Sequence, residues 1–458
     1  MKEFVLFRGR EKEIAILKKQ FSQDKRTAVL VYGKRRIGKT TLILEASKTF
    51  DGVVVCHTCV KSSYEGNLDL LARSICIGLG CPVIGFATIF DLFDFVRMQN
   101  KSILISIDEY QYFRQSKSGD EVDSFMQVVI DALPANVKLV LCGSYISVMK
   151  ELLLESNPLF GRFSSVIGLE EFDYKDSSLF YPSVPIRKKI ELYSVFGGSP
   201  FVLENLEVYE SIESNVEKLL LEPNSILRTH IESVMLKEIQ KGFDTRILMI
   251  IGNGKKRYSD IAKGLGGVDN GLLDKQLKSL VSMETLEKNF PINKNHDKKK
   301  QFYELSDNLM RFYFTYIWGN DSLIARLGSH GFYEMYIKDS LTTFVSFRFE
   351  RIVNQFFSRC VKEGTLKEVL DIGSFWYDDK ETKTNGQFDC VLKTLSGYNV
   401  YECKFLSTPM TLKDCEKEAT QISSVKGIEF AGVGFVSSSG FDFESSTFDL
   451  INGEELYW

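Results

Sequence analysis

The stretch from residue 28 to 41, AVLVYGKRRIGKTT, constrains the fold of this chain more than any other. An apolar run leads into Gly33-x-x-x-x-Gly38-Lys39-Thr40, and the next residues, LILEASKTF, have helical spacing. A strand, a glycine-rich loop and a helix in this order form a P-loop, whose backbone N–H groups wrap phosphates at the helix N-terminus. The alternative is a chance match on a basic loop, and the flanking strand and helix argue against it. The sequence therefore predicts an α/β domain that binds a nucleotide.

Each residue of this motif has a defined expected role. Gly33 and Gly38 let the backbone turn tightly around the phosphates. Lys39 would neutralise the β- and γ-phosphates, and the Thr40 hydroxyl would ligate Mg²⁺. Thr41 is expected among the residues that contact the nucleotide.

Two further apolar runs end in polar residues of the kind such a site needs. SILISIDEYQYF reads as a strand buried on both faces that ends in Asp108 and Glu109, and VKLVLCGS as another that ends at Ser144. Asp108 is expected to ligate Mg²⁺, Glu109 to polarise the attacking water, and Ser144 to sense the γ-phosphate. The alternative for the acidic pair is a helix N-cap at a strand end. Following a P-loop, the pair favours a catalytic role.

Arg162, within NPLFGRFSS, has two interpretations that the sequence leaves open. It could reach a phosphate in a neighbouring subunit as an arginine finger, in which case the working form is a homo-oligomer. It could equally be a surface arginine that caps a turn.

FRGREKEI at 7–14, the P-loop, IDEYQ, CGSYISVM and NPLFGRF together resemble archaeal and bacterial P-loop ATPases of the AAA+/STAND type. The resemblance implies ATP as the nucleotide and places Arg10, with Glu11, near it. It also implies a helical lid, because VFGGSPFVL at 195–203 is similar to the family's Gly-Gly-x-Pro motif. The alternative for Gly197, Gly198 and Pro200 is a turn between two helices.

The middle of the chain predicts a winged helix-turn-helix. Residues 174–245 have helical spacing, and the stretch from 257 to 306 then reads as helix, glycine-rich turn, helix, strand, basic turn and strand. The second helix is expected near 269–283 and the wing near 286–305. The wing could contact DNA phosphates through four lysines, Lys294, Lys298, Lys299 and Lys300, or it could be a solvated loop on a packing module. The second helix offers no basic stripe but a mixed set, Asp269, Asn270, Asp274, Lys275 and Gln276.

The last part, about 311–458, begins with helical patterns and continues with alternating segments. YELSDNLMRFYFTYIW at 303–318 is similar to the junction that joins such ATPases to a C-terminal domain without assigned function, although Asp307-Asn308 stands where the family usually has Asp-Pro. Its aromatic residues recur at helical spacing and indicate core. The next segments are FDCVLK, YNVYECKFL, a helix near 411–426 and FAGVGFVSS. In this order of elements the last part resembles the PD-(D/E)XK nuclease-like fold.

A metal site is expected on these strands. Glu402 and Lys404 share one face because residues two apart in a strand project together, and Asp389 on the preceding strand can converge on them. The two carboxylates would hold Mg²⁺ or Mn²⁺, and Lys404 would orient the nucleophile or stabilise developing charge. The resemblance adds Glu350 from the preceding helix, whereas Gln387 stands where the fold usually has a second carboxylate. The alternative is a hairpin with charges on its solvated face.

Composition limits the remaining possibilities. The 458 residues are 44% hydrophobic and 26% charged with a net charge of −4, which predicts several globular domains without a global basic field for nucleic acid. No signal-peptide pattern or apolar run of 18 residues is present, so a cytoplasmic protein without membrane partners is expected. The nine cysteines predict reduced thiols. Zinc binding by Cys56, Cys59, Cys76 and Cys81 is a weaker alternative to buried thiols.

Together the patterns predict four segments: an ATPase core at 1–175, a helical lid at 176–243, a winged helix-turn-helix at 244–310 and a nuclease-like domain at 311–458. The favoured hypothesis is an ATP-binding and ATP-hydrolysing regulator coupled to a metal-dependent nuclease that acts on nucleic acid, DNA above all. One alternative is a STAND-like signalling switch whose C-terminal fold is a non-catalytic binding module. The other is a DNA-binding regulator that works through the winged helix.

Overall fold

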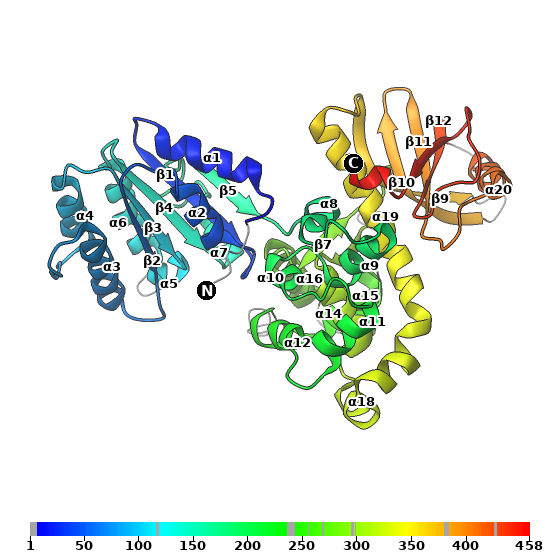
Figure 1. Ribbon diagram of the computed structural model, residues 1–458, viewed down its shortest axis with the longest axis horizontal. Coiled ribbons are helices and arrows are strands. Elements are labelled where there is room, and N and C mark those ends of the chain that lie inside the picture. Colours follow the sequence, from blue (N-terminus) through cyan, green and yellow to red (C-terminus); the bar gives the residue numbers. More distant parts are fainter. Residues whose placement is uncertain are drawn as a thin grey trace. The chain divides into compact units, whose positions relative to one another are not determined.

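The computed structural model describes residues 7–115, 119–235, 243–254, 256–267, 270–294, 297, 299–379, 384–425 and 428–458 (Figure 1). The chain divides into two compact units, Met1–Glu171 and Phe172–Trp458. Among the described residues, no helix combines the length and the apolar character that crossing a membrane would require.

Unit 1 is built on a five-stranded parallel sheet with the strand order β2-β3-β4-β1-β5 (Figure 1). The strands are β1 (Thr27–Gly33), β2 (Val53–Thr58), β3 (Ile103–Asp108), β4 (Val137–Gly143) and β5 (Ser165–Leu169). The helices are α1 (Glu11–Ser22), α2 (Lys39–Ser47), α3 (Tyr64–Leu79), α4 (Ile89–Met98), α5 (Tyr110–Arg114), α6 (Gly119–Asp131) and α7 (Ile146–Glu151). The predicted α/β class is therefore confirmed for this unit.

Helices cover both faces of this sheet, which is why its central strands are mainly apolar. Every residue of β3 and β4 is buried. One apolar core lies against α3, α4 and α6, and a second lies against α1 and α2. In parallel strands buried in this way, the polar side chains that serve a ligand lie at the carboxyl ends.

Unit 2 begins with helices and a small sheet. The helices are α8 (Tyr174–Ser177), α9 (Ile186–Phe196), α10 (Pro200–Glu204), α11 (Ile212–Val216), α12 (Ile226–His230), α14 (Arg246–Gly252), α15 (Tyr258–Gly264), α16 (Asn270–Ser282), α17 (Asn308–Phe312), α18 (Asp321–Tyr336) and α19 (Lys338–Glu363), with shorter turns η2 (Glu217–Leu221), η3 (Ile231–Met235) and η4 (Tyr313–Ile317). Strands β6 (Lys256–Arg257), β7 (Leu286–Asn289) and β8 (Phe302–Leu305) form an antiparallel sheet in the order β6-β8-β7.

A second five-stranded sheet forms the C-terminal part of unit 2, in the order β13-β12-β11-β10-β9. Its elements are β9 (Val369–Asp379), β10 (Thr384–Thr394), β11 (Gly397–Lys404), α20 (Leu412–Ser423), β12 (Phe430–Ser437) and β13 (Asp449–Asn452). Strands β9, β10 and β11 pair antiparallel, whereas β11, β12 and β13 pair parallel. The sequence patterns indicate β10, β11, α20 and β12 but neither of the edge strands, because β9 and β13 lack a clean alternation of apolar and polar residues.

Two apolar cores cross the boundaries predicted inside unit 2. One core runs from Phe172 to Phe344 and includes residues of the predicted lid, winged helix and junction. The core beneath the C-terminal sheet also contains Tyr174, Ile190 and Tyr193 of α8 and α9. The segments from 172 onward therefore share packing and do not each enclose a separate core.

Candidate functional site

The loop between β1 and α2 has the backbone geometry that its glycines permit. Gly38 is the residue before α2 and is left-handed, with φ 89°. A side chain on Gly33 would place Cβ 2.4 Å from the Leu169 carbonyl oxygen, so this close approach of β1 and β5 requires glycine. The loop thus turns tightly into the N-terminus of a helix, where backbone N–H groups are available to phosphate.

Lys39 lies inside this loop and not in solvent. The residue is 6% exposed, and its Nζ donates to the carbonyl oxygens of Gly33 at 3.0 Å and Lys34 at 2.9 Å. Both acceptors belong to the loop itself. The ammonium group is therefore held where a phosphate enclosed by the loop would meet a buried positive charge.

Thr40 and Asp108 meet although 68 residues separate them. The Thr40 hydroxyl donates to Asp108 Oδ2, and Asp108 Oδ1 accepts from the Glu109 backbone N–H at 2.8 Å. Thr40 is the second residue of α2, which follows β1, while Asp108 ends β3, so the sheet brings the two residues to one edge. A hydroxyl beside a carboxylate supplies the oxygen ligands that Mg²⁺ prefers. Thr41 lies one residue further along α2 and is exposed.

The Glu109 carboxylate is held by two buried polar residues. Ser144 Oγ donates to Glu109 Oε2 at 2.8 Å, and Gln111 Nε2 also donates to this oxygen. Gln111 is fully buried and donates to Ser144 Oγ at 3.1 Å. Glu109 itself is left-handed, with φ 52°, a backbone state that is uncommon outside glycine. Sequence reasoning missed Gln111, whose only signal is that it is a polar residue two positions after Glu109.

Two arginines considered for the nucleotide make other contacts in unit 1. Arg10, which is left-handed with φ 66°, donates to the Glu170 carbonyl oxygen and lies 3.7 Å from Glu13. Glu11 begins α1 and is exposed. Arg162 Nε lies 3.1 Å from Asp131 Oδ2 on α6. These contacts do not test whether Arg10 lies near the nucleotide or whether Arg162 acts as an arginine finger, so both roles stay predictions.

The Gly-Gly-x-Pro segment forms the connection between α9 and α10. Gly197 follows the last residue of α9 with φ 72°, and Pro200 is the first residue of α10. The Gly198 carbonyl oxygen accepts from the Phe172 N–H at 3.0 Å, and a Cβ on Gly198 would lie 1.8 Å from the Phe172 carbonyl oxygen. This local geometry is the helix–helix turn that the sequence offered as an alternative.

The four cysteines considered for zinc differ in burial. Two are buried, one is half-buried and one is exposed: Cys59 and Cys76, then Cys81, then Cys56. Burial, with the charges of Asp108 and Glu109, raises the pKa of Cys59 to about 12, which opposes the thiolate that zinc needs. Within the described ranges, one group of three or more possible ligands lies within 4.8 Å, and it contains none of these cysteines but Glu213, His330 and Glu334.

The predicted wing is partly buried. Lys294 and Lys299 are exposed and Lys300 is half-buried, whereas Ile292 between the strands is buried. On α16, Lys275 is exposed, and Asp274 pairs with Lys278 at 2.7 Å. Gln276 is half-buried on the same helix, and Lys298, Asp269 and the Asn270 side chain lie outside the described residues.

A second polar cluster lies on the C-terminal sheet. Lys404 Nζ lies 2.8 Å from Glu402 Oε1 and 3.3 Å from Glu418 Oε1 on α20. Burial raises the pKa of Glu402, and the nearby charges of Asp389 and Glu418 raise it further against the opposing effect of Lys404. Glu418 is a member of this cluster that sequence reasoning missed, because it comes from a helix that begins eight residues after β11 ends.

Asp389 and Glu350 belong to the same region. Cys390 of β10 pairs with Tyr401 of β11. Continuing this antiparallel register by one residue sets Asp389 beside Glu402. The Asp389 side chain accepts from Gln387 Nε2 at 2.5 Å. A hydrogen bond with Cys390 and burial raise the pKa of the Cys403 thiol, and the charges of Glu350 and Asp389 add to that rise. Asp389 and Glu402 are thus neighbours, Glu350 lies near Cys403, and Gln387 donates to the Asp389 carboxylate where the fold usually has a second carboxylate.

Comparisons with known proteins match two separate parts of the chain. Residues 7–206 match a family described as an ATPase domain predominantly from Archaea, and residues 313–420 match archaeal and bacterial proteins of unknown function. An uncharacterised protein of Methanocaldococcus jannaschii is 27% identical over 386 residues, which cover 82% of this chain and 83% of that protein.

Solved structures with similar folds include a Walker-type ATPase of Pyrococcus abyssi, with a TM-score of 0.49 and 17% identity over 67% of this chain and 96% of that one. Another is the ORC2 protein of Aeropyrum pernix in ADPNP–ADP complexes, with a TM-score of 0.47 and 12% identity over 67% of this chain and 93% of that one. The family match over residues 7–206 and the loop geometry, neither of which depends on these structures, support a P-loop ATPase domain in the N-terminal part of this chain.

Proposed function

We propose that this protein hydrolyses ATP with Mg²⁺ and uses that cycle to control a metal-dependent nuclease site on its C-terminal sheet. The observation that carries the second half is the cluster of Glu402, Lys404 and Glu418, with Asp389 on the neighbouring strand. An ordinary solvated hairpin would leave such charges exposed. Here burial raises the pKa of Glu402, so a cation would compensate a carboxylate that is costly to ionise.

At the nucleotide site each residue has a task that its contacts support. Lys39 would exchange its loop carbonyl acceptors for phosphate oxygens, and Thr40 with Asp108 would hold Mg²⁺. Glu109 would orient the attacking water, and Ser144 would report the γ-phosphate through the carboxylate it contacts. Bound Mg²⁺ supplies charge neutralisation on the phosphates.

At the C-terminal site, Asp389 and Glu402 would hold Mg²⁺ or Mn²⁺ through carboxylate oxygens, with Glu350 nearby. The metal, when bound, lowers the pKa of water and polarises the phosphodiester. Lys404, which two carboxylates hold, would orient the nucleophile or stabilise the developing charge. The element order α19, β9, β10, β11, α20, β12 supports the resemblance to the PD-(D/E)XK fold.

Nucleic acid, with DNA favoured, is the substrate that this chemistry suits. Helices α14, α15 and α16 with strands β6, β7 and β8 have the order of a winged helix-turn-helix. Residues 244–310 contain 12 Lys or Arg against 9 Asp or Glu, whereas the whole chain has 57 against 61. The local excess of positive charge would attract phosphates even though the chain as a whole is acidic.

A second candidate is a STAND-like switch in which the C-terminal fold binds a partner without cutting it. Gln387 favours this reading because its amide binds Asp389 where the fold usually has a carboxylate. A regulator that binds DNA through the winged helix is the third reading. That activity would depend strongly on salt and on DNA sequence.

The deciding experiment is cleavage of plasmid and single-stranded DNA with Mg²⁺ or Mn²⁺, with and without ATP. The variants are Lys39→Ala, Lys404→Ala and, as a matched control, Lys417→Ala on the exposed face of α20. Cleavage that Lys404→Ala abolishes, Lys39→Ala alters and Lys417→Ala leaves unchanged supports the nuclease. Absence of cleavage in all conditions, with ATP hydrolysis that depends on Lys39, would refute it and favour the switch.

A further inference from the structure

Helix α19 contacts two different sheets within two turns. On one side, Arg351 donates to both Glu287 carboxylate oxygens, Nη1 to Oε2 at 3.0 Å and Nη2 to Oε1 at 2.5 Å. On the other side, Asn354 Nδ2 donates to the Asp389 carbonyl oxygen at 3.3 Å and to the Glu350 carbonyl oxygen at 2.8 Å. The turn that carries Glu350 is therefore fixed between β7 and β10.

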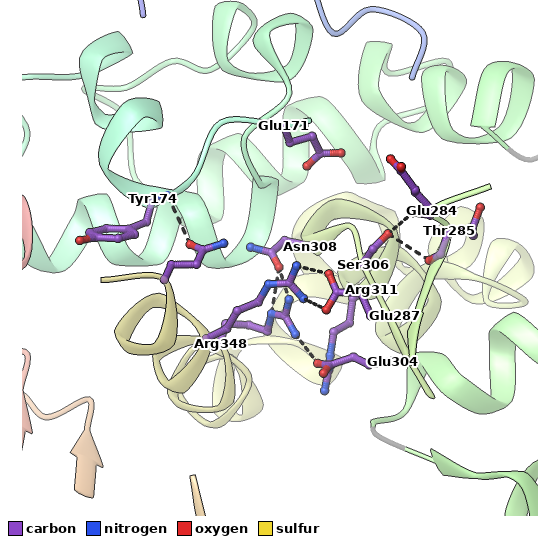
Figure 2. Close-up of polar contacts among 12 residues, drawn as sticks. Glu171, Tyr174, Glu284, Thr285, Glu287, Glu304, Ser306, Asn308, Arg311 and Arg348 are labelled. Carbon is purple, nitrogen blue, oxygen red and sulfur yellow. Dashed lines mark hydrogen bonds and ion pairs between the residues drawn. The ribbon is translucent and has the colours of Figure 1, made fainter. Parts of the chain in front are cut away.

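A buried charge network strengthens the first contact (Figure 2). Arg348 is 2% exposed, and its Nη1 donates to Glu304 Oε1 at 2.6 Å while its Nε donates to Asn308 Oδ1 at 2.9 Å. Arg311 also donates to Glu304. Separating α19 from β8 would leave buried charges unpaired, which is strongly unfavourable. Helix α19 and the β7–β8 sheet should consequently move together.

The connection between β7 and β8 is attached to the C-terminal sheet as well. The Ile292 N–H donates to the Ser374 carbonyl oxygen of β9 at 2.8 Å, and Ile292 packs in the core beneath β9 and β10. Asn293 Nδ2 donates to the Trp376 carbonyl oxygen at 2.7 Å, and its Oδ1 accepts from the Trp376 N–H at 3.2 Å. The Phe302 ring stacks on Trp376 with centroids 5.5 Å apart. These contacts attach β8 and the β7–β8 connection to β9, the strand that pairs with β10.

We propose that Arg351 is a positioning residue, and that its ion pair with Glu287 is the contact through which the β7–β8 sheet sets Glu350 beside the proposed metal site. This inference rests on the proposed function, because it concerns the same carboxylate cluster. Nucleic acid on the basic β7–β8 connection would act on the metal site through α19. A displacement of β7 would change the affinity of the Asp389 and Glu402 site for its metal.

Arg351 and Glu287 suit a test better than the fully buried network does. Their side chains are 25% and 36% exposed. Glu287→Gln therefore removes the partner of Arg351 while the Arg351 guanidinium keeps some contact with solvent. Glu363→Gln is the matched control, because Glu363 pairs with Arg359 on the same helix at 3.3 Å and with 42% exposure but does not contact β7. The Mn²⁺ binding that is lost in Glu402→Ala is taken as the binding at the proposed metal site.

The experiment is calorimetric titration of the full-length protein with Mn²⁺ in the absence of nucleotide, at a temperature where every variant is folded. The readout is the component of Mn²⁺ binding that Glu402→Ala removes. We expect Glu287→Gln to weaken it about tenfold, Glu287→Asp to recover part of the loss, and Glu363→Gln to leave it unchanged. A purely structural role would lower the unfolding midpoint without changing this affinity.

Two results would overturn the inference in distinguishable ways. If the parent shows Glu402-dependent Mn²⁺ binding and Glu287→Gln matches it, the inference is wrong while the proposed metal site stands. If Glu402→Ala removes no binding from the parent, the proposed metal site itself is wrong and the positioning role falls with it.

Discussion

Replacing Glu304 with leucine should destabilise unit 2 strongly. Glu304 is 7% exposed and accepts from Arg348 at 2.6 Å and also from Arg311. Burial and the charge of Arg311 lower the pKa of Arg348 to about 10, so this guanidinium remains charged at neutral pH. Removal of the carboxylate would leave two buried cations without their anion. Breaking a buried pair in this way typically costs about 3–5 kcal/mol.

The same principle predicts a rescue. When all members of a buried ion cluster are replaced by apolar residues of similar volume, the result is often neutral or stabilising. The triple variant Glu304→Leu, Arg311→Met, Arg348→Met should therefore lie within about 1 kcal/mol of the parent. Arg348 also donates to Asn308 Oδ1, so some loss from that hydrogen bond is included in this range.

Tryptophan fluorescence measures this effect in the right unit, because all three tryptophans, Trp318, Trp376 and Trp458, lie in unit 2. Urea unfolding gives the free energy, and a thermal scan should show a midpoint about 6–15 °C lower for the single variant. Nucleotide binding should be retained as the control for unit 1. A single variant within about 1 kcal/mol of the parent, or a triple variant as unstable as the single one, would refute the reasoning.

Three further outcomes follow from individual residues. His57 is 5% exposed, and burial lowers its pKa from 6.5 to about 4, so the unfolded state binds a proton before the folded state does as pH falls. The free energy of unfolding of unit 1 should therefore fall by about 3 kcal/mol between pH 6.5 and 4, measured by urea unfolding followed by circular dichroism. His57→Gln should flatten that pH dependence. Because burial raises the pKa of Glu402, protons should compete with Mn²⁺ there, and calorimetry from pH 8 to 5 should show weakening that Glu402→Ala lacks. Gly198→Ala should lower the free energy of unfolding by more than about 2 kcal/mol, since its Cβ would lie 1.8 Å from a carbonyl oxygen. Gly331→Ala in helix α18, where the nearest atom to the new Cβ is 3.5 Å away, should raise it by about 0.5–1 kcal/mol. Equal thermal midpoints for the two variants would contradict this.

The sequence by itself determined the nucleotide site, because its signals are local. A strand, a glycine loop and a helix occupy one short window, and Gly38, Lys39 and Thr40 have fixed places within it. The period of a strand likewise placed Glu402 and Lys404 on one face before any fold was known. The P-loop ATPase prediction is confirmed by the family match, while the nuclease, the winged helix and their partners stay predictions.

Only the tertiary structure decided which distant residues complete each site. Gln111 is just a polar residue in sequence, and it contacts Ser144 because β3 and β4 are neighbours in the sheet. Glu418 reaches Lys404 because α20 returns to pack against β12, the strand that pairs with β11. Contacts of this kind depend on strand order and register, which short-range periodicity does not encode.

The same limit explains the domain boundaries within unit 2. Tyr174 donates to the Leu456 carbonyl oxygen across 282 residues, so a helix expected near the lid belongs to the C-terminal core. From the sequence, Arg348 and Glu304 could each be an exposed charge, whereas in the structure both are buried and form an ion pair. Local patterns specify elements and their chemistry, whereas the energy of burying charge and apolar surface together decides how those elements join.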